Sequence, residues 1–591
     1  MRLALMTAAC LLAGGCGTSD DAGTAAPAND GLTPLARIQG SGPRSPLEGQ
    51  TVTVEAVVVG KFNGLGGVFL QSEQDDGDPA TAEGLFLPRE SRAEPRLAVG
   101  DRVRISGAVR ELGEGEATLT ALEASEVKVL GKGKPRAPVP VLELSGPPES
   151  AADWERYEGM RLRISGLGIT GNHALMSYGE LLASFGGPLV HPTELAAPSP
   201  GNPAAAAENA RRRLVLDDGR TSRNPERLWF LPALPSDAAP LRIGSRLGPV
   251  EGVLDQRFGG HRLQLVAPLE IVEQAPRPPA PKVAGDRRIA GFNVLNLFNG
   301  NGHGGGFPTG RGAATLAEYR RQQAKLVAVV QALDPDLAAL MELENDGYGP
   351  KSSIAQFVAA LNAAGPHRDW RFVDAGEGPG DNPIRVGLIY RADRISPVGA
   401  AVTLTEGPFA DRSRAPLVQA FRAGKGPVFV VAANHFKSKG GCDEAEQGDT
   451  DAGDGQACFN ATRVASARRL HEWLASDPTG TAPAGHLLIG DLNAHTQEDP
   501  LRLLRELGWR DALPTGESQP HTYVYDGQAG RLDHALLDTG LAPRLRQAAV
   551  WHNSADELEL FDYRRDHDDD AWRASDHDPI LLGLDLATGG L

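Results

Sequence analysis

The sequence has few aromatic residues, few cysteines, a deficit of basic residues and no long apolar segment. Phe, Trp and Tyr make up 5% of the 591 residues, and there are only four cysteines. No run approaches the ~18 apolar residues that a membrane-spanning helix needs. Against 59 Lys and Arg stand 76 Asp and Glu, for a formal net charge of −17. The chain as a whole is therefore not expected to attract nucleic acid electrostatically.

The composition is that of a folded protein with several domains. Hydrophobic residues make up 41% of the chain and charged residues 23%, which excludes a wholly disordered polymer. At roughly 100–200 residues per domain, the length predicts about three domains. The 71 glycines and 44 prolines, with few aromatics, indicate turn-rich β structure.

The first 16 residues have the pattern of an export signal. Arg2 precedes an apolar stretch over residues 3–15 that is too short to span a bilayer, and small residues lead to Cys16. This resembles a bacterial lipoprotein signal, although Ala13 stands where that pattern favours leucine. We expect acylation of Cys16 and anchoring to the cell envelope or surface; cleavage and secretion is the alternative. Residues 17–32 then form a flexible tether.

Export predicts a disulfide between the two remaining cysteines outside the signal. Thiols are not kept reduced outside the cytoplasm, so Cys442 and Cys458 can pair. Closing a loop of that size contributes about 3 kcal/mol in the chain-entropy treatment. Zinc binding is the alternative, but no CxxC or HxxxH pattern lies nearby.

Two proline-rich stretches divide the chain into three segments. Residues 134–140 and 276–281 contain several prolines each, which favour extended spacers because proline fixes φ and lacks an amide proton. The predicted units are a β module over 33–134, a second β module over 142–274, a Pro-rich linker over 275–285 and a third domain over 286–588.

The first two segments share a pattern of short strands. Residues 48–54 and 158–164 each contain a turn glycine followed by alternating apolar and polar residues, as half-buried strands do. Residues 99–103 and 243–247 form a second matching pair. The pattern predicts a small OB-like barrel in each segment. The second copy carries an insertion over 171–212 that we expect to be mostly loop.

The third segment alternates helices with buried strands, which indicates a layered α/β domain. Polar residues stand repeatedly at the ends of its apolar runs. Each one alone is most often a turn former, but five such positions in one domain predict a cluster at one rim of a sheet. Carboxylate and amide oxygens there suit hard cations, and histidines without cysteine partners suit proton transfer.

Six motifs of this segment match, in order, those of the endonuclease/exonuclease/phosphatase superfamily. They are Phe-Asn-Val-Leu-Asn at 292–296, Met-Glu at 341–342, Asn-His-Phe-Lys-Ser at 434–438, Gly-Asp-Leu-Asn-Ala at 490–494, Leu-Asp-His at 532–534 and Ser-Asp-His-Asp-Pro at 575–579. More narrowly, the chain resembles exported bacterial nucleases with OB-like N-terminal modules. The resemblance implies an α+β protein: a four-layer α/β sandwich catalytic domain, two packed sheets flanked by helices, preceded by two small OB-like β-barrel modules.

The resemblance also implies a metal site. Glu342 would bind the main divalent ion, Mg²⁺ or Mn²⁺ with Ca²⁺ as a third option. Asn293 would contact metal or phosphate beside it, and Asp576 would complete the site. Asp491 and Asn493 would hold the attacking water, a second ion or the scissile phosphate.

Two histidines are the implied proton-transfer groups. His577 is the candidate general base, with Asp533 fixing its tautomer. His435 is the candidate general acid or phosphate-charge stabiliser. Either Asp491 or His577 can be the group that takes the proton from water. Lys437, together with Lys439, either contacts phosphate or is an ordinary solvated loop lysine.

The leading hypothesis is an exported, metal-dependent nuclease that acts on extracellular DNA, with RNA as a second substrate. The motifs fit endonuclease and exonuclease action equally and carry no signal for oligomeric state. A phosphatase or phosphodiesterase for inositol phosphates, phospholipid headgroups or nucleotides is the alternative. A non-catalytic surface protein that binds nucleic acid is weaker, because every implied catalytic position is filled. Membrane contact is expected only through the lipid anchor.

The acidic charge is concentrated close to these motifs. Residues 442–458 hold six acids and no Lys or Arg, and residues 555–578 hold ten acids against three arginines. These two stretches therefore account for −13 of the −17. Cations can offset such local charge and bridge it to phosphate, so we expect activity to depend steeply on a divalent metal.

Overall fold

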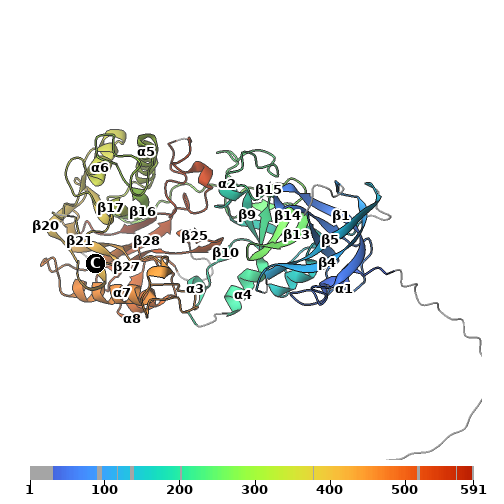
Figure 1. The fold of residues 1–591 in the computed structure, drawn as a ribbon. Helices are drawn as coiled ribbons and strands as arrows, with labels where there is room; N and C mark the ends of the chain where they lie inside the picture. Colours follow the sequence, from blue (N-terminus) through green and yellow to red (C-terminus); the bar gives the residue numbers. More distant parts are fainter. Residues whose placement is uncertain are drawn as a thin grey trace, which may run out of the picture.

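The computed structural model describes residues 31–89, 96–115, 117–133, 139–199, 203–376, 378–514, 520–567 and 569–588. They form three units in a row, with the first barrel at one end and the third segment at the other (Figure 1). The signal prediction, including acylation of Cys16, lies outside the described residues. Among the described helices, none is both long and apolar enough to cross a membrane.

The first segment is a closed five-stranded barrel, as predicted. Its strands pair in the order β1-β2-β3-β5-β4, and β3 meets β5 in parallel where Phe86 pairs with Ala121. Helix α1 (Leu35–Gln39) precedes the barrel. The strand bounds are β1 (Thr51–Phe62), β2 (Gly67–Gln71), β3 (Gly84–Pro88), β4 (Arg102–Glu114) and β5 (Ala117–Gly131).

The second segment forms one nine-stranded sheet, where the sequence predicts a small barrel. The sheet order is β15-β12-β8-β9-β11-β14-β13-β7-β6. Residues 171–212, expected to be mostly loop, supply β9 to its centre, because Leu181, Ala183 and Phe185 alternate into the core. The bounds are β6 (Leu142–Leu144), β7 (Arg161–Ile164), β8 (Leu167–Gly171), β9 (Glu180–Phe185), β11 (Arg213–Asp217), β12 (Arg246–Leu247), β13 (Val250–Arg257), β14 (Gly260–Leu265) and β15 (Ile271–Glu273).

The same insertion also contains β10 (Leu189–Val190) and three short helices. These are α2 (Leu175–Tyr178), α3 (Pro192–Leu195) and α4 (Pro203–Arg212). Strand β10 does not join the sheet of its own segment. It pairs in parallel with β26 of the third segment, with Leu189 opposite Gln528.

The third segment is the predicted four-layer sandwich. One six-stranded sheet has the order β18-β19-β17-β16-β29-β28 and the other β20-β21-β22-β23-β27-β24. Residues from both sheets, such as Ile289, Leu337, Val431 and Leu487, share one core between them. Helices α5 (Leu316–Leu333) and α6 (Ser353–Ala364) cover the first sheet, and α7 (Asn460–Ala475) and α8 (Asp499–Glu506) cover the second.

The strands of these sheets are short and end near the polar motifs. The first sheet contains β16 (Arg287–Leu297), β17 (Leu337–Glu344), β18 (Trp370–Phe372), β19 (Ile384–Arg391), β28 (Leu545–Val550) and β29 (Ile580–Leu584). The second contains β20 (Ser396–Thr403), β21 (Arg414–Arg422), β22 (Val428–His435), β23 (His486–Asp491), β24 (Arg510–Asp511) and β27 (Asp533–Leu537). Strands β25 (Tyr523–Tyr525) and β26 (Gln528–Gly530) form a separate hairpin.

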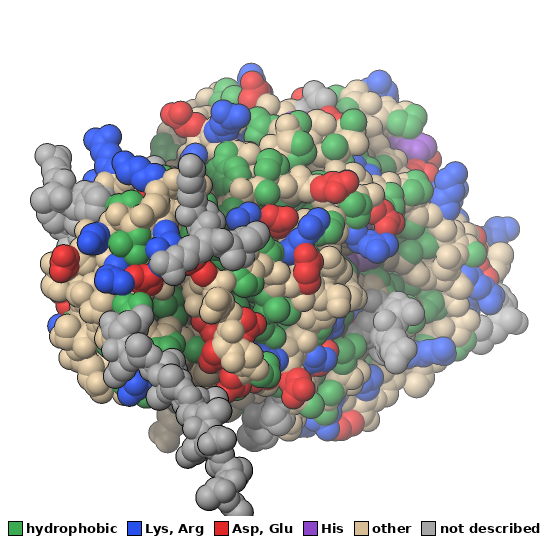
Figure 2. Space-filling view, turned by 90° about the vertical axis from the view of Figure 1, so that its right-hand side faces the viewer, with side chains coloured by type: hydrophobic (Ala, Val, Ile, Leu, Met, Phe, Trp, Pro, Cys, Tyr) green, Lys and Arg blue, Asp and Glu red, His purple; other side chains and the backbone are tan. Residues whose placement is uncertain are grey.

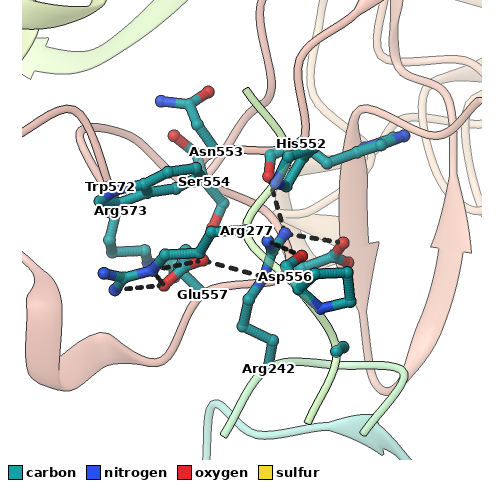
Figure 3. Close-up of polar contacts among 12 residues, drawn as sticks. Arg242, Arg277, His552, Asn553, Ser554, Asp556, Glu557, Trp572 and Arg573 are labelled. Carbon is teal, nitrogen blue, oxygen red and sulfur yellow. Dashed lines mark hydrogen bonds and ion pairs between the residues drawn. The ribbon is translucent and has the colours of Figure 1, made fainter. Parts of the chain in front are cut away.

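The linker over 275–285 packs against the third segment and is not a free spacer. The indole N–H of Trp551 donates to the carbonyl of Pro278 at 2.9 Å. Arg277 of the linker pairs with Glu557 at 2.8 Å, and Arg242 of the second segment pairs with the same carboxylate at 2.9 Å (Figure 3). Two acids of the 555–578 stretch, Asp556 and Glu557, are thus committed to this junction rather than to the polar cluster.

Candidate active site

The strand order brings the predicted polar residues to one place. Strands β16 and β17 are parallel neighbours in one sheet, and β22 and β23 are parallel neighbours in the facing sheet. His435 lies opposite Asp491 in the second pair, and Asp491 lies opposite Asp533 of β27. The two sheets meet at this rim, where the side-chain amide of Asn293 donates to Asp491 Oδ2 at 3.2 Å.

Glu342 is held by two asparagines of the first motif. Asn293 Nδ2 donates to Glu342 Oε1 at 3.3 Å, and Asn296 donates to Oε2 through its backbone N–H at 3.0 Å and its side chain at 2.7 Å. Glu342 itself has φ of 66°, a left-handed conformation that costs a non-glycine residue about 1–3 kcal/mol. Such strain is typical of functional sites, where it orients a side chain.

Negative charge accumulates in this cluster. Burial raises the pKa of Glu342 above its usual range, and the charge of Asp576 adds to the effect. Burial likewise raises the pKa of Asp491 to about 7, with the charges of Asp533 and Glu342 contributing. Because each carboxylate resists ionisation beside the others, a bound cation would stabilise the ionised cluster.

His577 and Asp533 form a buried dyad beside this cluster. His577 Nδ1 lies 2.6 Å from Asp533 Oδ2, which leaves Nε2 facing Asp491 Oδ2 at 3.9 Å. Burial by itself would lower the pKa of His577, but Asp533 and Asp576 raise it well above its usual range. The ring of Tyr523 packs on the imidazole at 4.6 Å between centroids. The dyad is therefore held with one ring nitrogen free for proton transfer.

His435 is buried and faces the same oxygen of Asp491 as His577 does. Its Nε2 is 3.5 Å from Asp491 Oδ2. Burial lowers the pKa of His435 well below its usual range, and the nearby charge of Arg414 lowers it further. The imidazole is thus neutral near pH 7, which suits a hydrogen-bond donor better than a general acid.

Asn493 supports the site through its backbone. Its N–H donates to Asp491 Oδ1 at 2.8 Å, and its side-chain amide donates to the carbonyl of Phe436 at 3.1 Å. Of the two lysines, Lys437 lies over the ring of Phe459 at 4.0 Å and stays partly exposed. Lys439 is instead buried in an ion pair with Glu498, so it does not face phosphate.

The predicted disulfide is present in the structure. Cys442 and Cys458 are bonded with their Cα atoms 5.5 Å apart, which closes the acidic loop. Asp449 of that loop accepts from the backbone N–H of Thr462 in α7 at 2.9 Å. Asp449 therefore binds the start of helix α7 and is not part of the polar cluster.

Three residues of the site were not assigned from the sequence. Arg414 lies opposite His435 in the β21–β22 pair, donates to the carbonyl of Phe436 at 2.9 Å and places a half-buried cation near Glu342 and Asp491. The sequence signal for Arg414 is a single arginine at the start of an apolar run. Thr522, whose hydroxyl accepts from the N–H of Asp533 at 3.1 Å, and Tyr523 lie between the fourth and fifth motifs and belong to neither.

A divalent metal ion fits the donors present. Asp491, Asp533 and His577 bring ligand atoms within 4.8 Å of one another, and Glu342 and Asp576 add carboxylates beside them. The buried Oδ1 of Asp533 has no hydrogen-bond partner among the described residues. Glu342, Asp491 and Asp576 would hold the ion; when bound, it neutralises phosphate charge and polarises the phosphoryl group.

The fold and the site are consistent with a phosphoester hydrolase, and a comparison with known families agrees with this class. Residues 290–577 match the model of the Endonuclease/Exonuclease/phosphatase family. Residues 134–274 match a domain of unknown function (DUF8508). No curated protein matches the chain.

Three solved structures align with about half of the chain. An endonuclease/exonuclease/phosphatase from Bacteroides vulgatus aligns over 51% of this chain and 98% of its own, at 15% identity and a TM-score of 0.33. TDP2 of D. rerio, in complex with a single-stranded DNA product, aligns over 50% and 97%, at 15% identity and 0.33. A mannosyl-6-phosphatase of Bacteroides thetaiotaomicron aligns over 51% and 99%, at 14% identity and 0.33.

Proposed function

We propose that the protein is an exported nuclease, dependent on Mg²⁺ or Mn²⁺, that hydrolyses phosphodiester bonds of extracellular DNA, with RNA as a second substrate. The observation that carries the hydrolytic part is the placement of the His577–Asp533 dyad against the carboxylates of Glu342 and Asp491. A phosphodiester resists attack because its charge repels nucleophiles, and this arrangement supplies both charge neutralisation and proton transfer.

Different residues of the site carry out proton transfer and stabilisation of the phosphate charge. Asp533 holds Nδ1 of His577, so Nε2 faces the carboxylate of Asp491 at 3.9 Å and the two groups titrate as a coupled pair. We assign acceptance of the water's proton to this pair. The neutral His435 and the half-buried Arg414 stand where they can donate to a phosphate oxygen and stabilise its charge.

The choice of DNA rests on the N-terminal units rather than on net charge. OB-like barrels commonly bind nucleic acid through one face and its loops. Figure 2 shows basic and acidic side chains interspersed on the face that the N-terminal end presents, with no single basic field. Binding there would depend on local contacts and should weaken less with salt than binding to a basic patch.

Export and lipid anchoring through Cys16 are part of the same proposal. The Cys442–Cys458 disulfide supports an oxidising compartment. Metabolic labelling with a radioactive fatty acid should mark the wild type and not Cys16→Ser. Labelling of both proteins, or of neither, would overturn the anchor.

The class of substrate is tested by offering the protein several kinds of phosphoester. Incubate the mature protein with plasmid DNA, RNA, a phosphomonoester and inositol phosphates, each with Mg²⁺, Mn²⁺, Ca²⁺ or EDTA. We expect DNA cleavage with Mg²⁺ or Mn²⁺ and none with EDTA. Intact DNA under every metal, together with cleavage of a phosphomonoester, would replace the nuclease by a phosphatase.

A further inference from the structure

The second segment contributes residues that reach the loops of the active site. Strand β10 pairs with β26, and the N–H of His191, the next residue along the chain, donates to the carbonyl of Ala529 at 2.9 Å. Strand β26 is the partner of β25, which carries Tyr523 against His577. The next element of the second segment, α3, lies directly behind the loop that follows Asp491.

Glu194 of α3 joins the two chain segments that hold the catalytic carboxylates. Its Oε2 accepts from the backbone N–H of Thr496 at 3.0 Å and from that of Arg531 at 3.1 Å, and its other oxygen accepts from the hydroxyl of Thr496. Thr496 follows Asp491 in the same loop, and Arg531 lies two residues before Asp533. The carboxylate is 2% exposed, so these bonds are shielded from water.

A second contact from α3 fixes the same loop. The hydroxyl of Thr193 donates to Glu498 Oε1 at 2.7 Å, an atom that also faces His495 Nδ1 at 2.9 Å and the ammonium of Lys439. Lys439 belongs to the loop after His435, so α3 is linked to both strand-end loops. Within the group His191, His495 and Glu498, the Lys439 cation already faces Oε1 of the carboxylate.

We propose that Glu194 is a positioning residue for the active site, and that the second segment is therefore a structural part of the catalytic centre. This rests on the proposed phosphoester hydrolysis. Glu194 ties the loop after Asp491 to the chain just before Asp533, where the paired strands β23 and β27 meet the site, and Asp533 in turn orients His577. A displacement of about 1 Å in such a pair can cost about a hundredfold in rate.

The test compares three variants of the full chain. Glu194→Ala should lower kcat about 10- to 100-fold with KM changed less than about twofold, because substrate contacts stay while the reacting groups shift. Glu194→Gln should restore most of kcat, since its amide oxygen can accept from both N–H groups. Asp217→Ala is the matched control: this buried carboxylate of β11 pairs with Arg262 inside the second segment, so its loss should lower Tm and leave kcat unchanged.

Hydrogen exchange provides a readout that does not need activity. In Glu194→Ala the amides of Asn493 and Asp533 should exchange faster, and in Asp217→Ala they should not. The proposal is wrong if Glu194→Ala keeps wild-type kcat, or if Asp217→Ala loses as much kcat as Glu194→Ala. If the wild type cleaves no phosphoester, the proposed function is wrong. Hydrogen exchange then decides the positioning role by itself, and unchanged exchange of both amides in Glu194→Ala would refute that role.

Discussion

At the scale of single residues, His577 is the side chain whose loss should reduce activity most. Its Nε2 is the ring nitrogen left free by Asp533, so His577→Ala should lower kcat about 10²- to 10⁴-fold, the usual contribution of a proton-transfer group. The measurement is steady-state hydrolysis of DNA with saturating Mg²⁺, alongside Tm to show that the protein is folded.

His303→Ala is the control for this substitution, because His303 is exposed on a loop away from the dyad. It should behave as the wild type. Near-normal turnover in His577→Ala would remove the dyad from the mechanism and leave Asp491 alone as the proton acceptor.

Glu342 should determine the affinity for the metal. Replacing its carboxylate by an amide in Glu342→Gln removes one charge from the cluster and one anionic ligand, so the Kd for Mn²⁺ should rise at least about tenfold, or about 1.4 kcal/mol. Isothermal titration calorimetry measures this in the absence of substrate.

Glu344→Gln is matched to it, since Glu344 lies two residues further along β17 and accepts from the backbone N–H of Asn299. Its substitution should leave the Kd unchanged. Equal affinities in the two variants would mean that Glu342 is not a ligand.

At the scale of elements, helix α3 should be weakened by acid. His191 caps this helix and stacks on the ring of His495 at 3.9 Å, and burial lowers the pKa of His191 to about 2. Since the usual pKa is near 6.5, the unfolded chain binds a proton below pH 6.5 that the folded chain refuses. Stability from this group is therefore present above pH 6.5 and is lost as the pH falls.

The expected loss between pH 7.5 and pH 5.5 is about 1.4 kcal/mol, or about one degree in Tm for a chain of this size that unfolds as one unit. In His191→Asn, which keeps an N-capping side chain but does not titrate, Tm should fall less over the same range. Thermal unfolding of both proteins at the two pH values decides this. Parallel pH curves would show that His191 does not contribute.

The elements of the third segment were largely predictable, and those of the second were not. Apolar runs ending at Asn293, Glu342 and Asp491 are local patterns, and the sandwich follows from them. The pairing of β10 with β26 leaves no local signal, because it joins two- and three-residue strands from different segments. Arg414 and Glu194 were missed for the same reason: each acts through residues distant in sequence.

At the scale of the whole molecule, the three units should unfold together. The first barrel contacts the second segment through Gln39, which donates to the buried Glu158 at 3.1 Å, and Val253 of the second segment shares a core with Phe69 of the barrel. The Glu194 and Arg242 contacts couple the second segment to the third. Differential scanning calorimetry should therefore show one transition for the wild type.

Phe69→Ala tests this coupling. Losing a buried phenyl ring typically costs about 3–5 kcal/mol, and the single transition should move to lower temperature as a whole. A separate early transition, with the remainder unchanged, would show that the barrel unfolds independently.

The pairing of β10 with β26 has a consequence for how the protein is made. The chain is synthesised from its N-terminus, so β10 exists long before its partner strand is available. An unpaired strand edge is a template for association with other chains. Because β10 has only two residues, it exposes a very short unpaired edge. The nascent chain therefore presents little surface for association with other chains before its C-terminal half is synthesised.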